Sequence, residues 1–313
     1  MKKTSGKKIS GADAIVESLV ANDVDTLFGL PGGQLDHLFD AVYRVGDAIR
    51  LIHTRHEQGA AYMAFGYAQT TGKEGVYTVV PGPGLLNSSA ALCTAWACNS
   101  PVLAISGQVH LAGIDSGYGH LHEIPDQLGL IRHITKWAER INHPAQTPDI
   151  MQRAFTELRS GRPRPVEVEM PMDVMGAEAV VAPARKAIAL EPPPVDADQV
   201  KAAAKVLTTA KRPLIVIGSG VLHGAPEVLA VAERLQAPVV AKRKGKGVIS
   251  DDHYLSQNLP AGHRLWGEAD VVLAIGTRLK MPLTMWGHDA ELKLVRVDID
   301  PVELTRIVQP DVG

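Results

Sequence analysis

The chain has 313 residues, and its 32 basic and 34 acidic side chains give a formal net charge of −2 at pH 7. This balance provides no broad positive field for nucleic acid or an anionic membrane, so we expect a small-molecule partner. Hydrophobic residues make up 45% and charged residues 21% of the chain, which indicates a globular protein rather than a disordered one. No apolar run approaches the roughly 18 residues that a membrane helix needs.

The two cysteines and the first residues favour a cytoplasmic protein. Cys93 and Cys98 stand five apart in an apolar run, where buried thiols are expected rather than a disulfide or a metal pair. Such thiols suit a reducing cytoplasm. Residues 1–9 are basic but lack the apolar centre of a signal peptide, and we predict that they form a flexible tail.

Residues 10–182 alternate strand-like and helix-like segments at the spacing of parallel α/β units. Short apolar runs predict strands that are buried on both faces, at residues 26–29, 50–53, 76–80, 102–106 and 166–169. Residues 57–71 are predicted to form an alanine-rich helix that ends at Gly72. The pattern therefore predicts an α/β fold with a doubly wound parallel sheet.

A run of prolines, Pro192-Pro193-Pro194, is the clearest composition break, because consecutive prolines favour an extended connection. We predict a linker at residues 183–196 and a second doubly wound α/β domain at residues 197–313. The predicted helices of this second domain are residues 197–210 and 225–235, and its predicted strands are residues 214–217, 239–241, 271–275 and 294–298.

Three loops that follow predicted strands are the first candidates for a ligand site: residues 30–34, 55–58 and 81–87. In open parallel sheets, ligands gather at the carboxyl ends of the strands. The prolines and glycines of these loops fix tight turns and leave backbone groups open to a ligand, although the same residues are common in any turn.

Together the three loops resemble the pyrimidine-binding domain of thiamine-diphosphate enzymes of the decarboxylase and acetolactate synthase family. The matching residues are Pro31-Gly32-Gly33 after the first strand, His56-Glu57 after the second, and Gly82-Pro83-Gly84 with Asn87 after the third. The second domain is similar to the family's central domain at Gly245-Lys246-Gly247, Gly276-Thr277-Arg278 and Val297-Asp298-Ile299-Asp300-Pro301. The resemblance implies a pyrimidine-binding domain at residues 10–182 and an incomplete central domain at residues 197–313.

The resemblance implies that Glu57 is the catalytic residue. Its carboxylate would hydrogen-bond the pyrimidine ring of thiamine diphosphate and favour the imino tautomer that removes the thiazolium proton, and the cofactor would then serve as electron sink for decarboxylation of a 2-oxo acid. The residues implied to line the pyrimidine site are Pro31, Gly32, Gly33, Pro83 and Asn87. The alternative is that Glu57 is an exposed helix N-terminal residue favoured by the helix dipole.

Two further residues are candidates for the substrate side of the site. Gln34 follows Gly33 where synthases carry a small residue, and its amide could reach a substrate or could cap the following helix. His122 stands where synthases have the glutamine of a Phe-Gln-Glu segment. An imidazole can exchange a proton near neutral pH, which favours chemistry other than acetolactate formation; the alternative is a loop histidine without a role.

The resemblance also bears on FAD, Mg²⁺ and partners. Arg162 matches an arginine that meets FAD in flavin-containing synthases, but the FAD loops expected after Gly247 are not evident, so FAD is possible and is not favoured. Family members hold Mg²⁺ and the cofactor diphosphate in a third domain, which nothing in these 313 residues matches. We therefore expect no metal ligand in this chain, which would be a truncated, cleaved or split product and inactive alone. A homodimer, a homotetramer or a partner chain would supply the diphosphate-binding domain.

Other functions stay open at the level of the sequence. Within the family, acetolactate synthesis competes with 2-oxo acid decarboxylation and benzaldehyde-type carboligation. A non-catalytic ligand-binding paralogue would keep the fold and lose the need for Glu57. A nicotinamide-binding oxidoreductase would depend on Gly218-Ser219-Gly220, which lacks the full dinucleotide-binding spacing.

Overall fold

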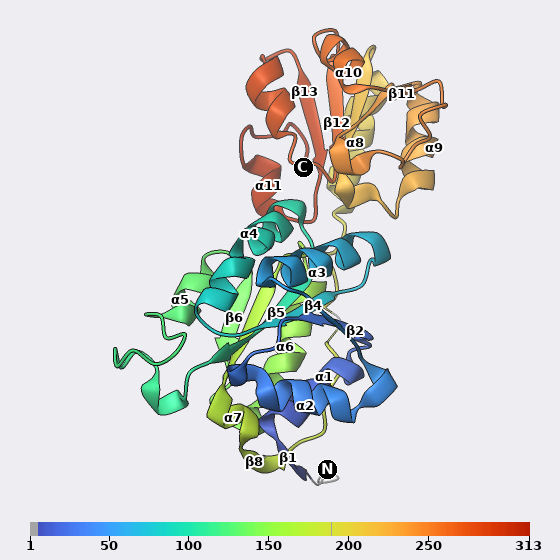
Figure 1. Ribbon diagram of the computed structural model, residues 1–313. Helices are drawn as coiled ribbons and strands as arrows, with labels where there is room; N and C mark the ends of the chain where they lie inside the picture. Colours follow the sequence, from blue (N-terminus) through green and yellow to red (C-terminus); the bar gives the residue numbers. More distant parts are fainter. Residues whose placement is uncertain (1–5, 189) are drawn as a thin grey trace. The chain divides into compact units, whose positions relative to one another are not determined.

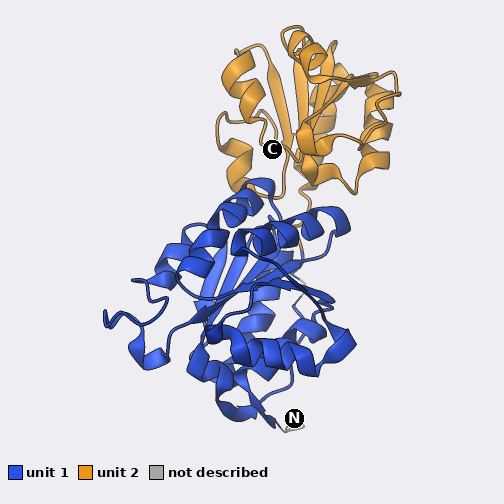
Figure 2. Cartoon of the chain, viewed as in Figure 1, with its two compact units in different colours: residues 1–191 blue, residues 192–313 orange. Residues whose placement is uncertain are grey.

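The computed structural model describes residues 6–188 and 190–313, and the chain divides into two compact units, residues 1–191 and 192–313 (Figures 1 and 2). Residues 1–5 of the predicted tail lie outside the described residues. Each unit is built on its own parallel sheet with helices packed on its faces. The predicted fold class, α/β with two doubly wound parallel-sheet domains, is confirmed.

The first unit contains a six-stranded parallel sheet in the order β3-β2-β4-β5-β7-β6. Its strands are β2 (Thr26–Gly29), β3 (Arg50–His53), β4 (Gly75–Val79), β5 (Val102–Gln108), β6 (Trp137–Arg140) and β7 (Val166–Pro171). All five strands predicted in this region are present. The sixth, β6, was missed because it is a half-buried edge strand whose sequence has no apolar run.

The helices of the first unit cover both faces of this sheet (Figure 1). One core contains buried residues of α1 (Gly11–Ala21), α2 (Asp36–Arg44), α6 (Thr147–Arg159) and α7 (Met172–Gly176). The other contains buried residues of α3 (Glu57–Thr71), α4 (Pro83–Cys98) and α5 (Gln127–Arg132). Fully buried side chains such as Phe155 and Leu92 each contribute about 2–3 kcal/mol to these cores.

The helix α3 packs directly on the sheet because its inner face consists of alanines. A Cβ atom at Gly75 of β4 would lie 1.9 Å from the carbonyl oxygen of Ala64, so helix and strand touch backbone to backbone. Gly72 ends α3 in the left-handed conformation with φ 72°, as predicted. The expectation of two buried thiols is wrong for Cys93, which lies on the exposed side of α4; Cys98 is half-buried.

The predicted flexible tail is shorter than expected, because its last residues belong to a small antiparallel sheet. Residues 7–9, assigned to the flexible tail, lie in β1 (Lys7–Ser10), which pairs with β8 (Glu178–Val181). Ile9 is buried against Val181 and Ala14, and this burial stabilises the pair. The sequence gives little sign of it because β1 is four residues long and its partner lies about 170 residues away.

The second unit has a five-stranded parallel sheet in the order β11-β10-β9-β12-β13. Its elements are α8 (Ala197–Thr209), β9 (Pro213–Ile217), α9 (Ala225–Leu235), β10 (Val239–Ala241), β11 (Ser256–Gln257), α10 (Leu259–Trp266), β12 (Val271–Ile275), β13 (Lys293–Val297) and α11 (Pro301–Thr305). The glycine turn after β9 serves close packing, since a Cβ at Gly220 would lie 2.6 Å from the Cα of Gly276. Within the described residues of both units, every helix is too short or too polar to cross a membrane.

Candidate active site

The three candidate loops meet at one edge of the first sheet, which we call the carboxyl edge. Strands β3, β2, β4 and β5 are neighbours and parallel, and their register pairs Gly29 with both His53 and Thr78, and Thr78 with Ile105. The strands therefore end nearly level with one another. The candidate loops that follow them, residues 30–34, 55–58 and 81–87, therefore lie at the same edge of the sheet.

Glu57 is the first residue of α3, where its negative charge is favoured by the helix dipole. His56 caps this helix, because its Nδ1 accepts a hydrogen bond from the backbone N–H of Gln58 at 3.1 Å. The Nδ2 of Asn87 donates to Oε2 of Glu57 at 3.0 Å. The Glu57 side chain is only 13% exposed, and within the described residues no donor is hydrogen-bonded to its Oε1. One carboxylate oxygen is thus oriented by the protein and the other is left for a ligand.

The glycines of two of these loops pack closely against Val80. A Cβ at Gly84 would lie 3.6 Å from Oε1 of Glu57 and 2.6 Å from Val80, and a Cβ at Gly32 would lie 2.4 Å from the other methyl of Val80. Close packing against Val80 therefore requires glycine at both positions, whereas nothing lies within 4 Å of the Cβ position of Gly33. Pro31, Gly33 and Pro83 are exposed at the same edge. The residues present therefore fit a flat ring that approaches Oε1 of Glu57 at this edge.

The two substrate-side candidates contact each other. Gln34 is buried, its Nε2 donates to the carbonyl of Leu121 at 3.1 Å, and its Oε1 lies 3.1 Å from Nδ1 of His122. Gln34 does not cap the following helix, because neither the short 3₁₀ turn at Gly33–Leu35 nor α2 has a side-chain cap. The structure therefore brings Gln34 and His122 together beside the pyrimidine loops.

The loop that carries His122 is organised by Glu123. The carboxylate of Glu123 accepts hydrogen bonds from the backbone N–H groups of Gly117, Gly119 and His120 at 2.8–2.9 Å. These donors hold the pKa of Glu123 below its usual value. His122 itself has φ 69°, a left-handed conformation that is uncommon for a residue with a side chain. Within the described part of the chain, no three His, Cys, Asp or Glu side chains form a group that could hold a metal ion.

Arg162 does not join this cluster. It is almost fully buried in the loop that precedes β7. Because β7 runs parallel to β4 and β2, its start lies at the opposite end of the sheet from the candidate loops. A contact between Arg162 and FAD stays a prediction.

Sequence reasoning missed Gln127, a buried residue that hydrogen-bonds the Gly82 amide at 2.7 Å. A signal was present in the strand at residues 166–169, where Glu167 and Glu169 alternate with valines. Both faces of a central parallel strand are covered, so two carboxyl groups there require buried polar partners. Gln127 is one of these partners, because its Nε2 donates to Oε2 of Glu169 at 2.8 Å.

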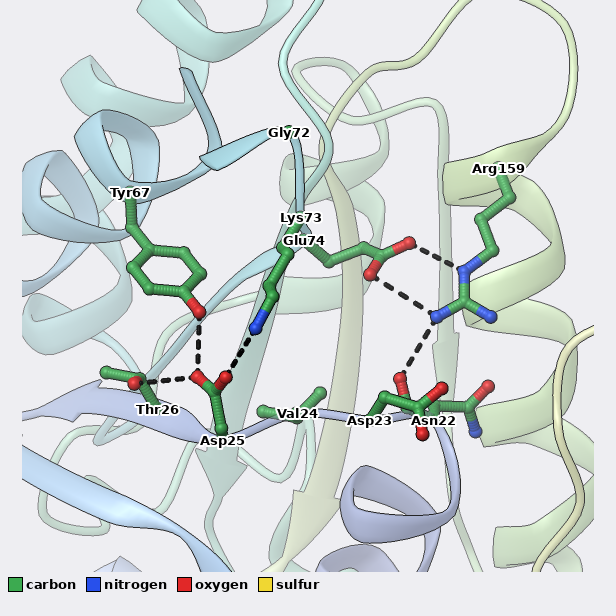
Figure 3. Close-up of a pocket in the computed structure, with 10 residues that line it drawn as sticks. All are labelled: Asn22, Asp23, Val24, Asp25, Thr26, Tyr67, Gly72, Lys73, Glu74 and Arg159. Carbon is green, nitrogen blue, oxygen red and sulfur yellow. Dashed lines mark hydrogen bonds and ion pairs between the residues drawn. The ribbon is translucent and has the colours of Figure 1, made fainter. Parts of the chain in front are cut away.

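A cavity of about 290 Å³ lies at the other end of the sheet, which we call the amino edge (Figure 3). Its lining comes from the segments that lead into β2 and β4 and from the end of α6. Asp25 accepts hydrogen bonds from Lys73, Tyr67 and Thr26, which lower its pKa to about 2. Arg159 pairs with Glu74 at 2.6 Å. The charged groups drawn in Figure 3 thus largely neutralise one another.

The fold and the carboxyl edge together define a class of protein. The resemblance to the pyrimidine-binding domain of thiamine-diphosphate enzymes implies a glutamate at the start of a small-residue helix beside two loops of proline and glycine, and Glu57 has this place in the fold. Comparison with known families agrees: residues 9–130 match the N-terminal TPP binding domain of thiamine pyrophosphate enzymes, and residues 200–313 match their central domain. The chain belongs to the thiamine pyrophosphate enzyme family, whose cofactor is thiamine diphosphate.

The individual relatives to which the chain is similar include acetolactate synthases and a probable decarboxylase. The chain is 38% identical over 323 residues to a probable acetolactate synthase large subunit of Methanococcus aeolicus. The aligned region covers 97% of this chain and 53% of that protein. It is 37% identical over 305 residues to a probable 2-ketoarginine decarboxylase of Pseudomonas aeruginosa, covering 94% of this chain and 54% of that protein. The predicted resemblance to acetolactate synthase large subunits is confirmed. The chain spans about half the length of the curated relatives it matches.

Proposed function

We propose that this chain provides the pyrimidine half of a thiamine diphosphate site in an enzyme that converts 2-oxo acids by decarboxylation and carboligation. The observation that carries this proposal is the 3.0 Å hydrogen bond from Asn87 to Oε2 of Glu57, with Oε1 left for a ligand. Family membership and the similarity to acetolactate synthase large subunits support the same class of reaction.

In this proposal Glu57 is the catalytic residue and holds a proton that it shares with the pyrimidine ring. Asn87 fixes the orientation of the carboxylate, and Pro31, Gly32, Gly33 and Pro83 line the ring, with open space at the Cβ position of Gly33. When bound, thiamine diphosphate supplies the electron sink for decarboxylation of the 2-oxo acid. The role of the protein is to place Glu57 and to exclude water around it.

The diphosphate and Mg²⁺ belong, in this proposal, to a further domain of the kind that acetolactate synthases carry. A second copy of the protein or a partner chain would bring that domain to the carboxyl edge in a dimer or tetramer. The 313-residue chain tested alone is then expected to be inactive toward 2-oxo acids, because the charge of the cofactor would remain unpaired.

Thiamine binding tests the pyrimidine site without the diphosphate. We expect the 313-residue chain to bind thiamine with a Kd on the order of 1 mM, because only the ring contacts are available. Glu57→Gln should weaken binding about tenfold or more, since it replaces a charge-assisted hydrogen bond with a neutral one. Glu17→Gln on α1 is the matched control and should bind as the wild type does. Equal affinity of the Glu57→Gln variant and the wild type, or no binding by either, would contradict the proposal.

A second candidate function is decarboxylation that ends in protonation instead of carboligation. It is favoured by the contact of His122 Nδ1 with Gln34, which orients the imidazole beside the pyrimidine loops and leaves Nε2 to exchange a proton. The similarity to a probable 2-ketoarginine decarboxylase supports this candidate.

Product analysis distinguishes the two candidates. In an enzyme assembled with a diphosphate-binding domain, His122→Gln is expected to shift products from the aldehyde toward the carboligation product. An unchanged ratio of the two products would rule out a role for His122 in protonation.

A further inference from the structure

A buried polar network lies beneath the turn that begins α4, and Gln127 is at its centre. The side chain of Gln127 is 1% exposed. Its Oε1 accepts a hydrogen bond from the N–H of Gly82 at 2.7 Å, and its Nε2 donates to the carbonyl of Gly107 at 3.1 Å and to Oε2 of Glu169 at 2.8 Å. A buried amide with these bonds has a single favourable orientation.

Glu169 determines which end of this amide faces Gly82. Glu169 is fully buried and forms an ion pair with Arg140, so its carboxylate can only accept hydrogen bonds. The amide nitrogen of Gln127 must therefore face Glu169 and the Gly107 carbonyl. The oxygen remains for the Gly82 amide, and a flipped amide would place acceptor against acceptor and donor against donor.

Gly82 occupies a position with little freedom. Its φ of 57° lies in the left-handed region, and a Cβ there would lie 2.2 Å from the carbonyl oxygen of His122. Gly82 is also the N-cap of α4 and has no side chain to cap the helix. One turn further along α4, Asn87 donates to Glu57. The start of α4 is thus fixed by the bond to Gln127 and in turn places Asn87.

We propose that Gln127 is a positioning residue of the pyrimidine site: by holding the Gly82 amide it sets the start of α4 and so aligns Asn87 with Glu57. This inference rests on the proposed function and extends it to a residue that has no contact with the pyrimidine ring. The line of contacts runs from Arg140 through Glu169 and Gln127 to Gly82.

A second buried carboxyl group completes the network. Ser106 Oγ donates to Oε1 of Glu167 at 2.6 Å, and burial together with the neighbouring Glu169 raises the pKa of Glu167 well above its usual value. A protonated Glu167 adds no charge beside Glu169. The Glu169 carboxylate and Arg140 then form the one ion pair of this network within the described residues.

Two substitutions of Gln127 test the inference in the full 313-residue chain. Gln127→Leu removes both ends of the amide, and we expect the Gly82 amide proton to exchange about tenfold faster or more, with thiamine affinity reduced about tenfold. Gln127→Glu introduces a carboxyl group that can accept from Gly82 and donate to Glu169 only while it is protonated.

The Gln127→Glu variant should therefore show a pH dependence of thiamine affinity in addition to that of the wild type. The charged or titratable groups around the introduced carboxyl group are Glu167 and Glu169 on β7, Arg140 on β6 and Arg132 on α5. We expect thiamine affinity close to that of the wild type at about pH 6 and a progressive loss relative to the wild type toward about pH 9. This comparison within one folded protein remains decisive if Gln127→Leu does not fold.

The two readouts separate the inference from the proposed function. An unchanged Gly82 exchange rate in Gln127→Leu would overturn the role of Gln127, as would unchanged thiamine affinity despite faster exchange. A Gln127→Glu variant with the pH profile of the wild type would also overturn it. A wild type that binds no thiamine while Gly82 exchange still depends on Gln127 would instead refute the pyrimidine site and leave Gln127 as a structural residue of the turn.

Discussion

The two edges of the first sheet carry similar kinds of polar side chains and use them differently. At the amino edge, Asp25 accepts three hydrogen bonds and Glu74 is paired with Arg159, so the charges around the cavity of Figure 3 are satisfied locally. At the carboxyl edge, Glu57 has one oxygen bonded to Asn87 and one oxygen without a donor among the described residues.

The presence of a cavity is therefore not enough to identify a ligand site. The amino edge contains a cavity of about 290 Å³, but its polar groups stabilise the fold by binding one another. The carboxyl edge has glycine loops, an oriented carboxylate and a buried network beneath them. A ligand adds hydrogen bonds only where the protein has left a partner unsatisfied. Substitutions at each edge should therefore have separable effects on stability and binding.

The largest expected effect is that of Gly82→Ala at the carboxyl edge. The left-handed φ of Gly82 and the 2.2 Å approach of a Cβ to the His122 carbonyl predict a loss of about 3 kcal/mol or more in the free energy of unfolding of the first unit. Gly33→Ala is the matched control, because nothing lies within 4 Å of its Cβ position, and it should change stability by less than about 0.5 kcal/mol. Urea unfolding measures both, and equal effects of the two substitutions would show that the turn is not constrained as described.

An intermediate effect is expected from the buried carboxyl group of Glu167. Its folded-state pKa is raised, so the native state holds a proton that the unfolded chain releases above the ordinary Glu pKa of 4.5. The stability contributed by this proton is complete below about pH 4.5 and falls as pH rises toward the folded pKa, by at most about 1.4 kcal/mol per pH unit. Glu167→Gln should remove this slope and be relatively more stable at higher pH. Parallel stability curves of variant and wild type between about pH 4 and 8 would argue against a protonated Glu167.

The smallest expected effect comes from Asp25 at the amino edge. Its pKa is lowered to about 2, so its contribution to stability is present above the ordinary Asp pKa of 3.8 and is lost as pH falls toward 2. The side chain is half-exposed, and Asp25→Asn should therefore cost less than about 1 kcal/mol at neutral pH. Thiamine affinity should not change. A loss of thiamine binding in this variant would mean that the amino edge takes part in the site.

Local signals made much of this fold predictable from the sequence. The predicted strands of both parallel sheets are short apolar runs, unlike β6 and β11, and β2, β3, β10 and β12 have the predicted limits. The end of α3 at Gly72 was predictable because helices commonly end at a residue in the left-handed conformation, which glycine adopts without strain. The loops that carry Glu57 and Asn87 were expected at one edge of the sheet because both follow parallel strands.

The contacts that could not be predicted from the sequence join residues that are distant along the chain. Gln34 and His122 are 88 residues apart, and Gly82 and Gln127 are 45 apart. Neither contact leaves a periodic pattern, because the loop before Gln127 has no regular structure. The strand β1 was missed for the same reason, since only its pairing with β8 orders it.

The most direct test of the account is to map thiamine on the protein by the amide NMR signals of the 313-residue chain. We expect thiamine to shift the signals of residues 32–34, 57–58 and 84–87, with Asn87 and Glu57 among them, and to leave residues 22–26 and 72–74 unchanged. Glu57→Gln should strongly reduce these shifts at a subsaturating thiamine concentration, in line with its about tenfold weaker binding. Shifts confined to the amino edge, or shifts at the carboxyl edge that persist undiminished in Glu57→Gln, would contradict the assignment of Glu57 to the pyrimidine site.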